Sequence, residues 1–220
     1  MSGTVYFWVA LPLLAAVSMG CNVVAPVAYA IGPEPKIAAV HIIEDKPTVV
    51  FVDDRLGRVS PSRLVRTLAD QTSEMLLDME LVETVYRPAD AIAFVKQNDR
   101  SDNVVSNQDI AEAVGADQLV YIEVIRFDLT AGGYSSKPTA VLNIKVLDIE
   151  DSRIVFPDPE SGQMIHQLLV ELPTVDIELF RSLSGRSQIK EQLAIESGDA
   201  VARLFYEYEP RILGDRLQAR

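Results

Sequence analysis

Charged residues are distributed very unevenly along this chain. The first 33 residues contain no Lys, Arg, Asp or Glu, whereas the rest of the chain carries all 20 basic and 32 acidic residues. Within the uncharged part, the run from Val5 to Met19 (VYFWVALPLLAAVSM) is interrupted only by Pro12 and Ser18. An uncharged apolar stretch of this length near the start is typical of a secretory signal. The sequence therefore divides into an export leader and a charged remainder able to fold in water.

The only cysteine, Cys21, directly follows the apolar run, in the context Val17-Ser18-Met19-Gly20-Cys21. This context resembles the bacterial lipobox. The resemblance implies that Cys21 becomes the first residue of the mature protein and carries acyl chains such as palmitate on its sulfur and its amine. We therefore expect residues 1–20 to be a signal peptide and residues 21–46 to be a lipidated N-terminus and linker.

Three other interpretations of the leader stay open. Ala28-Tyr29-Ala30 is an A-x-A site, and cleavage after Ala30 releases a soluble exported protein. The stretch from Val5 to Ile31 also exceeds the roughly 20 apolar residues that cross a bilayer, so an uncleaved anchor is a second alternative. A buried free Cys21 in an ordinary hydrophobic segment is the third. An anchored form is expected in the cell membrane or in the outer membrane.

Composition excludes several function classes. The formal net charge is −12, which argues against a nucleic-acid partner, because such binding depends on neutralising phosphates. A single cysteine excludes an internal disulfide framework, a four-cysteine zinc site and a CxxC redox pair. Only two histidines are present, and no glycine-rich phosphate loop is found. We expect no cofactor and no metal site.

Residues 47–209 show the patterning of one α/β domain, with residues 210–220 as a tail. TVVFV at 48–52 is a β-branched apolar run, typical of a strand covered on both faces. Ser60, followed by Pro61, is expected to cap a helix that extends to Met79. Further elements are expected at residues 81–86 (strand), from Pro88 (short helix), 106–115 (helix), 118–129, 139–149, 153–156 and 164–172 (strands), and 187–208 (helix).

This order predicts the α/β (α+β) class: a single domain with a mixed sheet, an early βαβα part, an antiparallel meander and a C-terminal helix. In the strand at 139–149, Asn143 and Lys145 alternate with apolar residues, which predicts one solvated face. The segment Ser182 to Ser187 is expected to be a loop before the final helix. Gly198 is expected to weaken that helix by about 1 kcal/mol.

Residues Thr48 to Phe156 resemble a group of envelope lipoproteins and domains. The residues that carry the resemblance are the TVVFV strand, the amphipathic helix from Ser60 to Met79, and IAEAVGADQLVYIEV from Ile110 to Val124. The group includes the curli-secretion lipoproteins, the lipoprotein activators of penicillin-binding proteins and the N-terminal domain of the Tol-system propeller protein. The resemblance implies a non-enzymatic protein and supplies no catalytic residues. Pore-forming segments are not evident in this chain.

Asp53 and Asp54, which follow an apolar strand, are candidate metal ligands. VVFVDDR is similar to the first strand of a response-regulator receiver, where paired acids hold Mg²⁺, and Lys137-Pro138 is similar to a later receiver motif. However, no Asp ends the strand at 118–129, and three consecutive strands contradict alternation of strand and helix. We therefore expect Asp53 and Asp54 to lie in a solvated turn.

The remaining polar residues indicate no catalytic apparatus. His41 and His166 have no recognisable partner in the sequence, and no G-x-S-x-G elbow exists. We expect a non-catalytic, lipid-anchored, periplasm-facing cell-envelope protein that acts in interaction or assembly. Its expected partners are the membrane, through lipid on Cys21, and another envelope protein at the edge of the meander. The alternative is an exported hydrolase or small-ligand-binding protein on the same scaffold.

Overall fold

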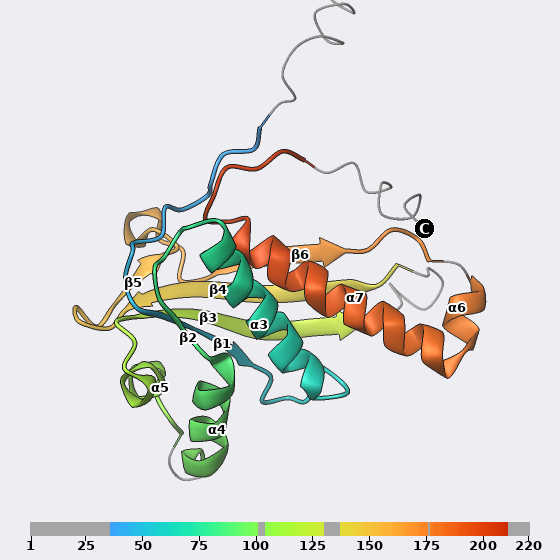
Figure 1. The fold of residues 1–220 in the computed structure, drawn as a ribbon, viewed down its shortest axis with the longest axis horizontal. Helices are drawn as coiled ribbons and strands as arrows, with labels where there is room; N and C mark the ends of the chain where they lie inside the picture. Colours follow the sequence, from blue (N-terminus) through green and yellow to red (C-terminus); the bar gives the residue numbers. More distant parts are fainter. Residues whose placement is uncertain (1–35, 101–103, 130–136, 176, 211–220) are drawn as a thin grey trace, which may run out of the picture. The chain divides into compact units, whose positions relative to one another are not determined.

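A computed structural model describes residues 36–100, 104–129, 137–175 and 177–210. The expected signal peptide and Cys21 lie outside these ranges. Within them, the chain from residue 37 onward forms a six-stranded mixed sheet in the order β2-β1-β3-β4-β5, with β6 also paired to β4 (Figure 1). The predicted fold class is confirmed: parallel βαβα part first, antiparallel strands next, and a long helix last.

Strand β1 (Thr48–Asp53) lies at the centre of the parallel part, and all six of its residues are buried. It pairs in parallel with the two-residue strand β2 (Val85–Tyr86) on one side and with β3 (Gln118–Asp128) on the other. Burial on both faces explains the unbroken apolar run, because neither face of β1 meets water. The strand predicted at 81–86 is shorter in the structure. Only Val85 and Tyr86 form strand pairs, with Thr48 and Val49 of β1.

Strand β4 (Thr139–Asp148) joins the parallel part to the antiparallel edge. It runs antiparallel to β3 on one side. On its other side it pairs with β5 (Arg153–Phe156) near its C-terminal end and with β6 (His166–Glu171) over its N-terminal half. Strands β5 and β6 together therefore form one edge strand, interrupted by an excursion of residues 157–165 that contains the short 3₁₀ helix η1 (Pro159–Ser161).

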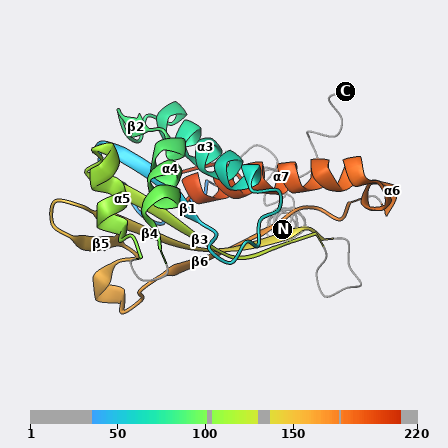
Figure 2. The same ribbon diagram turned by 90° about the horizontal axis from the view of Figure 1, so that it is seen from below.

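Helices cover the two faces of the sheet unequally (Figure 2). One face is packed against α3 (Arg63–Asp78) and α7 (Leu183–Ala202), which lie side by side. The shorter α4 (Pro88–Asn98) and α5 (Asn107–Val114) pack over the other face near β1. The short α6 (Ile177–Arg181) precedes α7 and packs against it. The larger core lies on the α3/α7 face, around Leu64, Leu68, Ile122, Leu142, Ile144 and Leu193.

The predicted start and end of the helix at 106–115 are confirmed. The Ser106 hydroxyl accepts a hydrogen bond from the Asp109 N–H at 3.1 Å, and the Asp109 carboxylate accepts one from the Ser106 N–H, which together form a capping box. Gly115 ends the helix with φ 79°, a conformation that favours glycine. These signals are local in sequence, which is why they could be recognised without the fold.

Two predicted helix starts were wrong. Helix α3 has Ser62, not Ser60, at its N-cap, and no side-chain hydrogen bond is formed there. Helix α7 begins at Leu183, inside the segment predicted to be a loop, because the Ser182 hydroxyl accepts a hydrogen bond from the Gly185 N–H at 2.9 Å. The polar composition of this first turn reflects exposure to solvent and not a loop.

The prediction that Asn143 lies on a solvated face of β4 was also wrong. Asn143 is buried, and its amide nitrogen donates a hydrogen bond to the Glu123 carboxylate of β3 at 2.9 Å. Strand β4 has paired strands on both sides, so Asn143 lies between Glu123 and Gln167 across three strands. Cross-strand neighbours, which alternation along one strand does not reveal, shield it from water.

Helices α3 and α7 touch at Gly198. A Cβ atom added at Gly198 would lie 2.7 Å from the Cβ of Gln71 and 2.8 Å from the carbonyl oxygen of Leu68. The neighbouring Asp199 accepts a hydrogen bond from the Gln71 amide at 2.7 Å. The absence of a side chain at Gly198 therefore allows the two helices to approach, which compensates for the poor helix propensity of glycine.

We expect Gly198→Ala to lower the free energy of unfolding by about 1–2 kcal/mol. Overpacking a tight contact costs about 1–3 kcal/mol, which exceeds the gain of about 1 kcal/mol in helix propensity. Denaturant unfolding measures the difference. Ser184→Ala, at an exposed position of α7, is the control and should change stability by less than about 0.5 kcal/mol. A Gly198→Ala protein as stable as the unmodified one would contradict this role.

Candidate functional site

The segment Ile37–Lys46, named here the strap, lies against the domain before β1 begins. Ile37 forms an antiparallel bridge with Tyr208, and the N–H groups of Val40 and His41 both donate to the carbonyl oxygen of Leu204. Ile43 is 6% exposed and belongs to the larger core. The strap therefore connects any anchor at Cys21 to the segment that follows α7.

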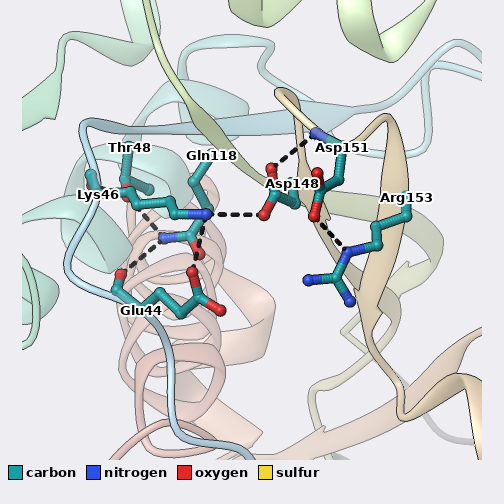
Figure 3. A network of polar contacts seen from close by, with 7 residues as sticks. All are labelled: Glu44, Lys46, Thr48, Gln118, Asp148, Asp151 and Arg153. Carbon is teal, nitrogen blue, oxygen red and sulfur yellow. Dashed lines mark hydrogen bonds and ion pairs between the residues drawn. The ribbon is translucent and has the colours of Figure 1, made fainter.

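Lys46 fixes the end of the strap to the sheet (Figure 3). Its ammonium group lies 2.7 Å from the carboxylate of Asp148, the last residue of β4, and 2.8 Å from that of Glu44. The Gln118 amide donates to the Glu44 carbonyl oxygen at 3.1 Å and to the Thr48 hydroxyl at 2.9 Å. The strap is thus tied to β1, β3 and β4 at one point.

The Lys46–Asp148 pair changes the protonation of both groups. The hydrogen bond from Lys46 lowers the pKa of Asp148, and the Asp151 N–H, which donates to the same carboxylate, acts in the same direction. Hydrogen bonds to Asp148 and Glu44 raise the pKa of Lys46. The Asp148 side chain is 4% exposed and that of Lys46 is 28% exposed, so the carboxylate depends on this cation for its charge partner.

The fold brings the two histidines to one place. The rings of His41, in the strap, and His166, the first residue of β6, each lie 5.1 Å from the ring of Phe156 between centroids. Phe205 completes the cluster, 6.0 Å from Phe156. Burial lowers the pKa of both histidines, although Glu44 and Asp158 partly offset this for His41. Sequence patterns did not predict this proximity, because Phe156 lies far from His41 along the chain.

The prediction that Asp53 and Asp54 lie in a solvated turn was wrong for Asp53. Asp53 is buried, and its carboxylate accepts a hydrogen bond from the Tyr121 hydroxyl at 2.7 Å. Burial, followed by this hydrogen bond, raises the pKa of Tyr121. The Asp54 carboxylate accepts hydrogen bonds from the N–H groups of Arg58 and Val59, at 2.7 and 2.9 Å, and so closes the turn. Both acids therefore have structural partners.

The other residues of the receiver interpretation do not form a receiver site. Lys137 pairs with Glu171 at the edge of the sheet, 3.2 Å away. Strands β3, β4 and β5 are consecutive and antiparallel, in contrast to a strand-helix repeat. Among the described residues, no group of three or more His, Cys, Asp or Glu is placed to hold a metal ion.

A cleft of about 590 Å³ opens beside the C-terminal end of β1, between α3 and α4. Strand β2 pairs only with the first two residues of β1, so in the described chain no strand covers Val50–Asp53 on this edge. The cleft is lined by apolar side chains, by the cations Arg55, Arg63, Arg66 and Lys96, and by Asp53 and Asp54. Sequence reasoning singled out only the two acids, because the cations lie on three separate elements.

The outer edge of β6 is the second open feature. Within the described ranges, β6 pairs only with β4. Leu169, at the middle of this strand, is 58% exposed. It lies opposite Val141 of β4, which in turn lies opposite Arg126 at the β3 bulge. A strand edge with unpaired backbone groups and an exposed leucine is able to accept an added strand.

No family model and no curated protein matches the chain. Solved structures that resemble it include protein XCC0632 of the DUF330 family from Xanthomonas campestris, with a TM-score of 0.47, 14% identity, and coverage of 86% of this chain and 94% of that one. A PelC dodecamer from Paraburkholderia phytofirmans has a TM-score of 0.37 and 11% identity, with coverage of 78% of this chain and 93% of that one. Lipoprotein GNA1162 from Neisseria meningitidis has a TM-score of 0.36 and 15% identity, with coverage of 67% of this chain and 92% of that one. All three scores are below 0.5, so these likenesses carry no argument about function.

None of the helices in the described ranges combines the length and the apolar character needed to cross a bilayer. The resemblance to the curli-secretion group stays an expectation from sequence. Cys21, the predicted lipidation site, stays a prediction as well, because it precedes the first described residue.

We expect Lys46→Met to lower the free energy of unfolding by about 1–3 kcal/mol, because a buried carboxylate then loses its charged partner. The matched control is Lys137→Met, which breaks the exposed pair with Glu171 and should change stability by less than about 1 kcal/mol. Denaturant unfolding at neutral pH measures both. Equal effects of the two substitutions would contradict a special role for Lys46.

Stability should also fall as the pH drops from 7.5 to 5.5. The folded protein holds His41 and His166 at a lowered pKa, so the unfolded chain binds protons first, as pH falls through the ordinary histidine pKa of about 6.5. The stability that the two neutral histidines contribute is fully present above that pH and is lost below it. The double variant His41→Gln/His166→Gln should flatten the slope of unfolding free energy against pH in this window. An unchanged slope would show that the histidines are not responsible.

Proposed function

We propose that this protein is a non-catalytic, lipid-anchored protein of the bacterial cell envelope that faces the periplasm and binds another envelope protein. The observation that carries the proposal is the uncharged leader that ends at Cys21, followed by a charged folded domain. Two acyl chains or more on one residue give stable attachment, since each buried methylene contributes about 0.8 kcal/mol. The membrane is then the first partner, through Cys21.

The length of chain between Cys21 and the strap sets how far the domain can move from that membrane. Ile37, where the fixed part of the chain begins, lies 16 positions after Cys21. At no more than about 3.5 Å per residue, this tether reaches at most about 55 Å. A domain held within this distance encounters other proteins of the same envelope layer and not those in bulk solution.

The contacts of the acidic and histidine residues support a non-catalytic role. Asp53 and Asp54 accept hydrogen bonds that shape the end of β1, and Asp148 is paired with Lys46. The rings of His41 and His166 pack against that of Phe156 in tilted arrangements. General acid–base catalysis requires a titratable group within reach of substrate, and these groups instead face structural partners.

The free edge of β6 is the proposed surface for the protein partner, which would add an extended segment as a further strand. The exposed Leu169 supplies an apolar contact next to the edge. Main-chain hydrogen bonds would give affinity, and side-chain contacts on the open face would give specificity. This choice retains the interaction function expected from sequence and assigns it to one strand.

The competing class is an exported hydrolase or a small-ligand-binding protein. The cleft beside β1 favours the ligand-binding member of this class. Its lining contains no histidine, and the carboxylates of Asp53 and Asp54 both accept hydrogen bonds. Ligand binding in this cleft is compatible with an adaptor role, because the β6 edge belongs to the opposite side of the sheet order.

Cys21→Ser should move the protein from the membrane fraction to the soluble fraction. Intact mass of the native protein should equal that of residues 21–220 plus acyl chains. Ala30→Leu is the matched control and should leave the localisation unchanged and alter the intact mass only by the difference between alanine and leucine. A mature protein that begins at Ile31 would support soluble export, and a full-length protein that stays membrane-bound after Cys21→Ser would support the uncleaved anchor.

A second experiment tests the proposed protein partner by comparing Leu168→Pro with Leu169→Pro. Neighbouring residues of a strand direct their N–H groups to opposite edges, so only one of the two prolines disrupts pairing with β4. The variant that keeps the melting temperature should lose the protein that co-purifies from membranes with the unmodified chain. Retained co-purification in that variant would exclude the β6 edge as the binding surface.

A further inference from the structure

The cleft beside β1 has two chemically different parts. Its inner walls are apolar and come from three elements: Phe51 and Val52 of β1, Val65 of α3, and Ile92 and Val95 of α4, together with Val59 of the intervening loop. Phe51 and Val52 are almost completely buried, whereas Ile92 and Val95 are half-buried. A volume of about 590 Å³ is within the range of sites that hold small molecules.

Cations surround this apolar wall. Arg55, Arg63, Arg66 and Lys96 line the cleft, against only two carboxylates, those of Asp53 and Asp54. The lining therefore contains four basic residues against two acidic ones, and three of its arginines also have an acidic partner outside the lining, namely Asp99, Glu191 and Asp70. Low-dielectric walls next to these charges strengthen their attraction for an anion.

Arg63 is paired with the Glu191 carboxylate, whereas the other three cations retain the capacity to bind a further anion. The Arg55 Nε lies 3.6 Å from Asp53 and 3.5 Å from Asp99, and both distances are longer than a hydrogen bond. Lys96 is exposed and forms no ion pair with a described residue. Arg66 pairs with Asp70, but both side chains are substantially exposed, and such pairs contribute little and exchange readily.

We propose that this cleft binds a single-chain amphiphile with an anionic head, its acyl chain against Val65, Ile92 and Val95 and its head between Arg55 and Lys96. Guanidinium and ammonium groups bind carboxylate and phosphate alike, so the shared chemistry is an anionic head on one apolar chain. This ligand site is separate from the β6 edge and from Cys21, and it goes beyond the proposed function. A negative result here leaves the anchoring and the adaptor role untouched.

The test uses the full chain in lipid nanodiscs and a fatty acid that carries a photoactivatable diazirine in its acyl chain. After illumination, mass spectrometry should locate crosslinks within residues 51–66 and 88–98. Dodecanoate and dodecyl phosphate are added as separate competitors, and the stronger one identifies the preferred head. Dodecyltrimethylammonium, with the same chain length and opposite charge, should not compete.

Two variants with matched controls decide between specific binding and general apolar adsorption. Ala93 is exposed and lines the cleft, so Ala93→Trp should fill it and reduce crosslinking at least fivefold. Ala113→Trp, at an exposed position of α5, should have no effect. Lys96→Glu should also reduce crosslinking at least fivefold, whereas Lys137→Glu should not.

All four substitutions are at surface or half-exposed positions, so we expect each variant to fold. Circular dichroism checks this for each one. Crosslinks outside the two segments, equal competition by the cationic amphiphile, or undiminished crosslinking in Ala93→Trp would each overturn the proposal. Loss of crosslinking in Ala113→Trp as well as in Ala93→Trp would do the same, because the effect would then not depend on the cleft.

Discussion

The burial of β1 on both faces is the constraint on which the rest of the structure depends. Six consecutive buried residues form a strand that no water reaches, so both sides must be covered by helices. Helix α3 covers β1 on one side and α4 covers it on the other. Because β2 pairs with only two residues of β1, the covering helices meet beyond it across a gap in the sheet. The cleft is therefore a result of how the central strand is enclosed, and its apolar walls are the same side chains that protect β1.

The second constraint is the fixation of the strap. A chain that reaches the domain from a membrane anchor transmits any displacement to the first point at which it is held. Here that hold is shared between backbone hydrogen bonds to Leu204 and the ion pair between Lys46 and Asp148. The first connects the strap to the segment after α7, and the second connects it to the end of β4. The His41–Phe156–His166 contacts are a third attachment and connect the strap to the interrupted edge strand.

Sequence patterns predicted the elements whose signals are local. The run TVVFV gave β1, and Ser106, Asp109 and Gly115 gave both ends of α5, because each signal lies within one turn or one strand. The pairing of Lys46 with Asp148 spans 102 positions, and no local pattern contains it. The burial of Asn143 and Asp53 likewise depends on neighbouring strands. The cationic part of the cleft was missed because Arg55, Arg63 and Lys96 come from a loop and two helices that only the fold brings together. Cys21 is the reverse case: the sequence alone carries that prediction.

The bridge between Ile37 and Tyr208 places the entry and the exit of the domain's chain next to each other. Whatever is joined to either end is therefore attached at a single location on the domain. A module added after Tyr208 would therefore join the domain beside the strap, at the place where the chain enters it.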